Sequence, residues 1–205
     1  MTNVLAIHSV GESLRTYLDT SYPADLRAAH PCEFRLLSSG ELAASAEIDG
    51  ALTLYLYRVT VNEYARNVRR VTDATHENVP LAVDLHYLLT VWSRSAFTEH
   101  VIVAWAMRQL HQHPVLDASS LTSEAAWGAG DFVQVIPAEL STEEVMRIWD
   151  TFEPKYRLSV SYIARVVRID TDPVLEGMPV VARRLSYDST VAAPPLVGAG
   201  AGGSA

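Results

Sequence analysis

The sequence predicts an α+β fold, with a mixed, mostly antiparallel sheet and two or three helices packed on it. Segments in which apolar and polar residues alternate are typical of strands, and they are interspersed with segments whose apolar residues recur at helical spacing. Some neighbouring strands also lie too close together in the chain for crossover helices, which favours antiparallel pairing.

The first expected elements are a helix and a short strand. Apolar residues at helical spacing over residues 3–20 predict an amphipathic helix, and Pro23 ends it. The segment Cys32–Leu37 follows as a short strand. The small residues from Ser38 to Ala46 then predict a loop.

Residues 52–61, LTLYLYRVTV, alternate strongly and are rich in aromatic and β-branched residues, as strands are. One face of this strand is expected to carry Leu52, Leu54, Leu56 and Arg58, and the other Thr53, Tyr55, Tyr57 and Val59. The tyrosines are expected either to pack beneath a helix or to contribute to an interface. Residues 62–80 are polar, lack a clear period and predict a long loop.

Residues 80–92, PLAVDLHYLLTVW, predict a long strand. Its apolar face consists of Val83, Leu85, Tyr87, Leu89 and Val91. Asp84 and His86 lie on the other face, together with Ala82, Leu88 and Thr90. This pattern is typical of a strand with one buried face and one face that meets solvent or a partner.

The remaining elements alternate between helix and strand. A helix is expected over Thr98–His113, a brief strand over Phe132–Ile136 and a long strand over Tyr156–Ile169. Between the last two, Ser141 followed by Glu144 forms a capping box that predicts the start of a helix.

The chain is expected to divide into a main domain, a short arm and a tail. Residues 1–172 form the domain, and residues 173–187 form an arm with a strand candidate at 178–187. This strand either completes the chain's own sheet or adds to the sheet of a neighbour. Residues 188–205 are rich in Ala, Gly and Pro and are expected to be a flexible tail.

Composition excludes several classes of function. The net charge is −8, from 24 acidic and 16 basic residues, which argues against a nucleic-acid binder. No apolar run approaches the roughly 20 residues needed to cross a bilayer, so no membrane partner is expected. A single cysteine and an N-terminus without a positively charged leader favour a cytoplasmic protein.

The sequence contains no clear catalytic or metal site. Cys32 stands beside a proline and a glutamate, which disfavours a reactive thiolate. His111 and His113 diverge near a helix end and supply no zinc site. Asp84 and His86 share a strand face and are the basis of an alternative, a small hydrolase-like enzyme, but no nucleophile accompanies them. We therefore expect no enzyme, no cofactor and no metal.

Five segments, in this order and spacing, resemble the cap proteins of contractile injection systems, the phage-tail-like particles that drive a rigid tube into a target. They are LTLYLYRVTVNEYARN (52–67), PLAVDLHYLLTVW (80–92), AMRQLHQHPVL (106–116), IPAELSTEEVMRIWDTF (136–152) and YRLSVSYIARVV (156–167). The resemblance covers about residues 4–172. It implies a domain similar to phage tail terminators, six copies of which form a ring that closes the inner tube and the sheath.

The resemblance therefore implies partners: other copies of this chain, the tube protein and the sheath protein. We expect the subunit or partner contact to involve an Asn- and Arg-rich stretch on and after the strand at 52–61, namely Arg58, Asn62, Asn67, Arg69 and Arg70. An adaptor that binds another protein outside a particle shares these features and remains an alternative.

Overall fold

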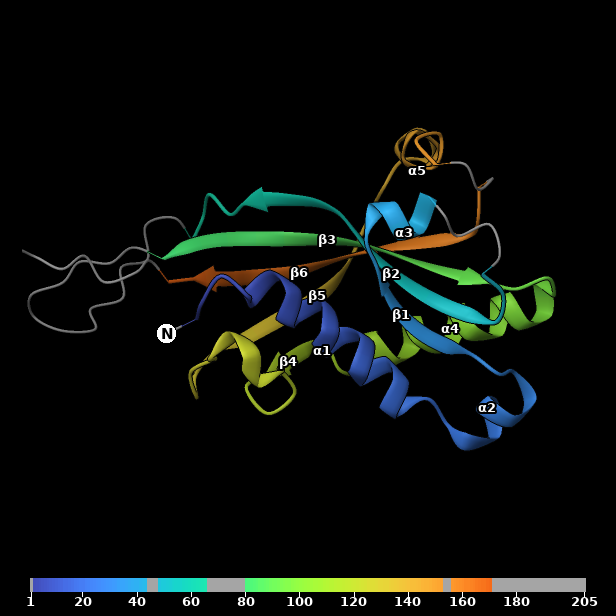
Figure 1. Cartoon of the computed structure of the whole chain (residues 1–205), viewed down its shortest axis with the longest axis horizontal. Helices are drawn as coiled ribbons and strands as arrows, with labels where there is room; N and C mark the ends of the chain where they lie inside the picture. Colours follow the sequence, from blue (N-terminus) through green and yellow to red (C-terminus); the bar gives the residue numbers. More distant parts are fainter. Residues whose placement is uncertain (1, 44–47, 66–79, 153–155, 171–205) are drawn as a thin grey trace, which may run out of the picture. The chain divides into compact units, whose positions relative to one another are not determined.

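Six strands form one sheet in the part of the chain that the computed structural model describes, residues 2–43, 48–65, 80–152 and 156–170 (Figure 1). The strand order is β1-β2-β3-β6-β5-β4. Only β1 and β2 pair in parallel, and the other pairs are antiparallel. The strands are β1 (Glu33–Leu37), β2 (Ala51–Val61), β3 (Leu81–Trp92), β4 (Val115–Asp117), β5 (Phe132–Ala138) and β6 (Ser159–Ile169). The predicted α+β class with a mixed, mostly antiparallel sheet is confirmed.

Helices cover both faces of this sheet (Figure 1). The helices are α1 (Ala6–Ser21), α2 (Ala24–Ala29), α3 (Ser39–Ala43), α4 (Ala96–Gln112) and α5 (Thr142–Trp149), with a 3-10 turn at Ser123–Ala125. We call the face packed against α1 and α4 the inner face, and the face packed against α3 and α5 the outer face.

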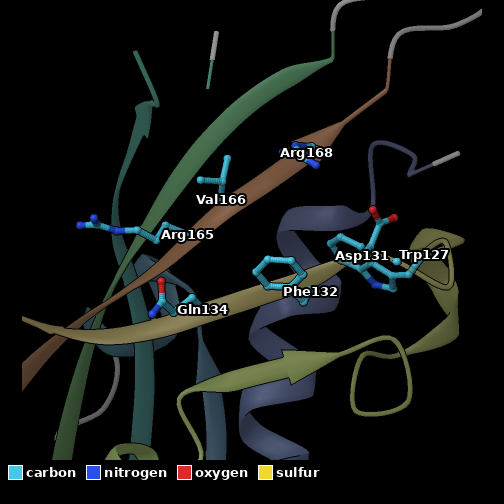
Figure 2. Close-up of a pocket in the computed structure, with 8 residues that line it drawn as sticks. Trp127, Asp131, Phe132, Gln134, Arg165, Val166 and Arg168 are labelled. Atoms are coloured by element: carbon cyan, nitrogen blue, oxygen red, sulfur yellow. The ribbon is translucent and has the colours of Figure 1, made fainter. Parts of the chain in front are cut away.

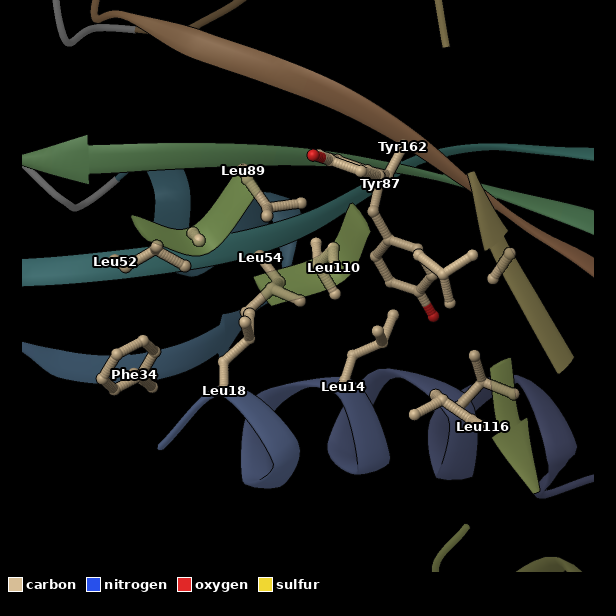
Figure 3. Close-up of a cluster of buried hydrophobic side chains, with 14 of the residues drawn as sticks. Leu14, Leu18, Phe34, Leu52, Leu54, Tyr87, Leu89, Leu110, Leu116 and Tyr162 are labelled. Atoms are coloured by element: carbon tan, nitrogen blue, oxygen red, sulfur yellow. The ribbon is translucent and has the colours of Figure 1, made fainter. Parts of the chain in front are cut away.

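The main core fills the space between the inner face and the helices α1 and α4 (Figure 3). Leu14 and Leu18 of α1 meet Leu54 of β2 and Tyr87 of β3, and all four are at most 1% exposed. Each such side chain contributes about 1.5–3 kcal/mol relative to an exposed one. The apolar face predicted for β3 is thus confirmed.

A second, smaller core lies on the outer face. Trp149 of α5 packs edge-on against Trp92 of β3, with ring centroids 6.0 Å apart. Tyr55 of β2 meets Phe152 just after α5, at 5.5 Å. The interpretation that the tyrosines of β2 pack beneath a helix therefore holds for Tyr55. Leu88 of β3 is buried in the same cluster, so this half of the outer face is covered rather than solvated.

Two helices and one strand were not expected from the sequence: α2, α3 and β4. The loop predicted for Ser38–Ala46 is wrong in its first half, where α3 forms. Ser38 donates its backbone N–H and its hydroxyl to the Glu41 carboxylate, and the Glu41 N–H returns a hydrogen bond to the Ser38 hydroxyl. This is a second capping box, and burial of Leu42 fixes the turn on the sheet. The strand expected at 178–187 lies outside the described residues.

The capping box predicted at α5 is confirmed and gives a testable expectation. The Ser141 hydroxyl accepts from the Glu144 N–H at 3.2 Å, and the Ser141 N–H donates to the Glu144 carboxylate at 2.9 Å. We expect Ser141→Ala to lower the free energy of unfolding by about 1 kcal/mol, because one N-terminal N–H loses its acceptor. Urea denaturation measures this loss. The neighbouring exposed Thr142, changed to Ala, is the control, and an equal loss there would contradict the assignment.

Candidate docking surface

A bulge in β2 changes which side chains reach the outer face. Leu56 pairs with Tyr87, and Arg58 pairs with His86, so Tyr57 is the extra residue. An extra residue shifts the alternation by one position. Arg58 therefore lies on the outer face beside His86, and the prediction that it shares a face with Leu52 and Leu54 is wrong. The alternation itself is correct only as far as the bulge.

A second irregularity, in β6, brings another arginine to the same area. Val83 pairs with Val167 and Leu85 with Ala164, so β6 has one residue more than β3 between these pairs. The extra residue lies at Arg165 or Val166. The electrostatic influence of both Arg165 and Arg58 reaches His86. Arg165 is not among the residues expected at an interface, although two arginines three residues apart in one strand, 165 and 168, are a sign of broken alternation.

Asp84 and His86 each have a partner of their own on this surface. The side-chain amide of Asn62 donates to both carboxylate oxygens of Asp84 at 3.0 Å. The His86 Nε2 shares a hydrogen bond with the Thr60 hydroxyl at 3.0 Å, and its ring lies 5.8 Å from that of Tyr57. These contacts join β2 to β3. They give each polar residue a structural role that requires no catalysis.

Burial lowers the pKa of His86, and the Arg58 guanidinium lowers it further, while Asp84 partly offsets both. The folded protein therefore binds the proton of the His86 ring less tightly than the unfolded chain does. Histidines of an unfolded chain have a pKa of about 6.5. As the pH falls through that range, the unfolded chain takes up a proton that the folded state resists, and stability is lost.

We therefore expect His86→Gln to remove part of the loss of stability between pH 7.5 and 5.5. Urea denaturation of the parent and the variant at both pH values measures this effect. The exposed His111 of α4, changed to Gln, is the matched control. If both variants responded alike, the environment assigned to His86 would be wrong.

The structure places two of the five residues predicted for an interface. Arg58 is exposed on the outer face, in a position to meet a partner. Asn62 is only 8% exposed. Its side chain binds Asp84 and accepts from the Ala65 N–H at 2.9 Å, so it shapes the turn after β2. Asn67, Arg69 and Arg70 lie outside the described residues, and their role stays a prediction.

A small hollow lies beside this surface, between β5 and β6 (Figure 2). Its volume is about 150 Å³, and Trp127, Phe132, Gln134 and Arg168 contribute to its lining. Small-molecule sites usually have about 300–1,000 Å³, so this hollow is too small for a typical substrate. Phe132 at its rim is 61% exposed, which is more typical of a protein contact.

The other candidate groups do not form a reactive site among the described residues. Burial raises the pKa of the Cys32 thiol to about 12, so the thiolate is scarce at neutral pH. No group of three or more metal-ligating side chains comes together in the described parts of the chain. His113 instead packs its ring against Tyr17, at 6.1 Å. No described helix is long and apolar enough to span a bilayer.

Comparison with known proteins finds a family model and solved structures that this chain resembles. The family described as Pvc16 N-terminal domain matches residues 9–183. One similar structure is the sheath/tube terminator of PVC, an extracellular contractile injection system, in its extended state. This chain matches it with a TM-score of 0.59 and 15% identity over 95% of its own length. The tube-terminating cap of the anti-feeding prophage, AFP, has a TM-score of 0.54 at 16% identity over 91%. The chain spans 66% and 62% of those two proteins. No curated protein matches it significantly.

Proposed function

We propose that this chain, which belongs to the Pvc16 N-terminal domain family, caps the inner tube and sheath of a contractile injection system and so ends their polymerisation. The observation that carries the proposal is the backbone fold, which 95% of the chain shares with the PVC sheath/tube terminator. Five sequence segments independently resemble cap proteins. The family match and the shared fold therefore support the same function.

The proposed active form is a ring of six copies that contacts the tube protein and the sheath protein. A closed ring requires heterologous contacts, in which one patch of each subunit meets a different patch of the next. The exposed Arg58 on β2 and the exposed Phe132 on β5 are the residues that we assign to two such patches. In this proposal the chain is a structural component of the assembled particle.

The alternative of a hydrolase-like enzyme finds less support. Both carboxylate oxygens of Asp84 bind the Asn62 amide rather than the His86 ring, so the Thr60–His86 hydrogen bond lacks the orienting carboxylate of a catalytic triad. The hollow between β5 and β6 has only about 150 Å³, and neither Asp84 nor His86 lines it. An adaptor outside a particle would use the same surfaces and would differ only in its partner, and the fold shared with two terminators favours the cap.

Particles from a strain that lacks this chain test the proposal directly. Electron microscopy should show overlong or open-ended tubes, because nothing ends tube growth, and the intact chain supplied from a plasmid should restore their length. Closed tubes of normal length in the deletion strain would refute the capping function. Light scattering of the purified protein, alone and with tube protein, measures the number of copies in the ring.

A further inference from the structure

The second half of β2 leaves one backbone edge open. β1 pairs with β2 only from Ala51 to Tyr55, and no described strand pairs with Leu56–Val61 on the side away from β3. Figure 1 shows β2 continuing well past the end of β1. Because the Asn62 N–H donates to the Ala82 carbonyl of β3, alternation directs the N–H groups of Val59 and Val61 toward the open side. An open edge of this length is a template for another strand.

The side chains around this edge are unusually apolar for a surface. On the inner face, Val59 is 45%, Val61 55% and Leu81 47% exposed. A groove of about 560 Å³ lies beside the edge, and its apolar lining includes Val4, Ile7, Leu36 and Leu56. A strand added at the edge would direct every second side chain into this groove, so apolar residues at alternate positions would fit it.

Two acidic side chains also line the groove: Glu41 of α3, and Glu12 of α1, which pairs with Arg15 at 2.7 Å. The strand candidate at residues 178–187, MPVVARRLSY, has apolar residues in both alternating sets and two arginines, and it has no acidic residue. Its charge is therefore opposite to that of the groove's two acidic side chains and to the net charge of −8 of the whole chain. Opposite charges select a partner and fix its register.

We propose that the open edge of β2, Leu56–Val61, receives residues 178–187 of a second copy of this chain as an added strand. The proposal rests on the proposed ring, in which each subunit must present one donor patch and one acceptor patch. β6 ends at Ile169, which pairs with Leu81 at the same end of the sheet as the open edge. The eight residues 170–177 span at most roughly 26–29 Å, enough to reach an adjoining subunit.

Disulfide cross-linking between two different full-length variants tests this exchange. One carries Val59→Cys, and the other carries either Val180→Cys or Val181→Cys. After mixing and mild oxidation, we expect the yield of linked chains to be at least tenfold higher with one of the two donor positions than with the other. The reason is that adjacent side chains of a strand point to opposite faces. The native Cys32 is buried and its pKa of about 12 keeps it unreactive.

Two controls make the result decisive. Val115 on β4 is 47% exposed, and Val59 is 45% exposed. The variant Val115→Cys is therefore a matched control, and we expect it to form no link with either donor. A variant with both Val59→Cys and Val181→Cys, and one with Val59→Cys and Val180→Cys, reveal linkage within one chain. Linkage found only within one chain, equal linkage at both donor positions, or no linkage at all would each overturn the exchange.

Failure of this inference and failure of the proposed function give different results. If the rings form and the tubes end normally while no exchange is detected, only the added strand is wrong. If the deletion strain makes closed tubes of normal length, the capping function is wrong whatever the cross-linking shows. Val59→Pro adds a second test, because it removes an outward N–H without touching the ladder to β3. We expect it to reduce ring formation at least tenfold, and unchanged ring formation would also overturn the exchange.

Discussion

Replacing Trp149 with alanine is expected to lower the free energy of unfolding by about 3–5 kcal/mol, the usual range for a large buried aromatic residue. Trp149 is 3% exposed and is the one buried residue of α5. Its ring contacts Trp92, Phe152 and Tyr156 at centroid distances of 6.0–6.5 Å. Without it, the helix loses its anchor and the outer face of β3 is exposed to water.

Two matched variants separate this anchoring from other effects. The indole N–H of Trp149 is buried and has no hydrogen-bond partner among the described residues, so Trp149→Phe removes an unsatisfied donor while keeping an aromatic ring. We expect a loss of about 1 kcal/mol or less for that variant. Met146 lies on the same helix and is 39% exposed. Urea denaturation that found Met146→Ala as costly as Trp149→Ala would contradict the assigned packing.

Local sequence patterns predicted those parts of the fold whose signals are themselves local. The capping box at Ser141 and the helical stripe after it predicted α5, and both were correct. The same four-residue pattern begins at Ser38, but Gly40 and the small residues around it favour a loop, so α3 was missed. α3 exists because Leu42 has a buried place on the sheet, and only tertiary structure provides that place.

The candidate surface was predictable only in part, for a related reason. The position of Arg58 on a strand was clear from alternation, but its face was not, because the bulge at Tyr57 depends on how β2 pairs with β3. The hydrogen bonds from Asn62 to Asp84 join residues 22 positions apart and leave no local signal. Arg165 was missed because its relation to His86 arises from the pairing of β3 with β6.

In the proposed ring, with Arg58 at the subunit contact, charge reversal at this residue is expected to abolish assembly while leaving the subunit folded. Arginine is among the residues that contribute most to interfaces, and loss of such a residue costs at least about 2 kcal/mol, or about 30-fold in dissociation constant. Arg58 is exposed and belongs to no ion pair among the described residues, so its removal breaks no contact of that kind within the subunit. Light scattering of Arg58→Glu, and microscopy of particles made with it, measure the effect.

Two further variants distinguish a lost contact from a disturbed subunit. Arg94 lies near the start of α4, is 91% exposed and forms only a surface ion pair with Asp49 at 3.3 Å, so Arg94→Glu introduces the same charge change with little expected effect on assembly. Arg58→Gln removes the charge without placing a carboxylate near Glu144. The pKa of Glu144 is lowered by its hydrogen bonds with Ser141 and also by the charge of Arg58. We expect Arg58→Gln to weaken the ring less than Arg58→Glu and to raise the pKa of His86, which NMR titration can follow. A higher pKa of His86 in Arg58→Gln would support the described fold of the outer face. If Arg58→Glu nevertheless formed rings as readily as Arg94→Glu, the subunit contact would lie elsewhere.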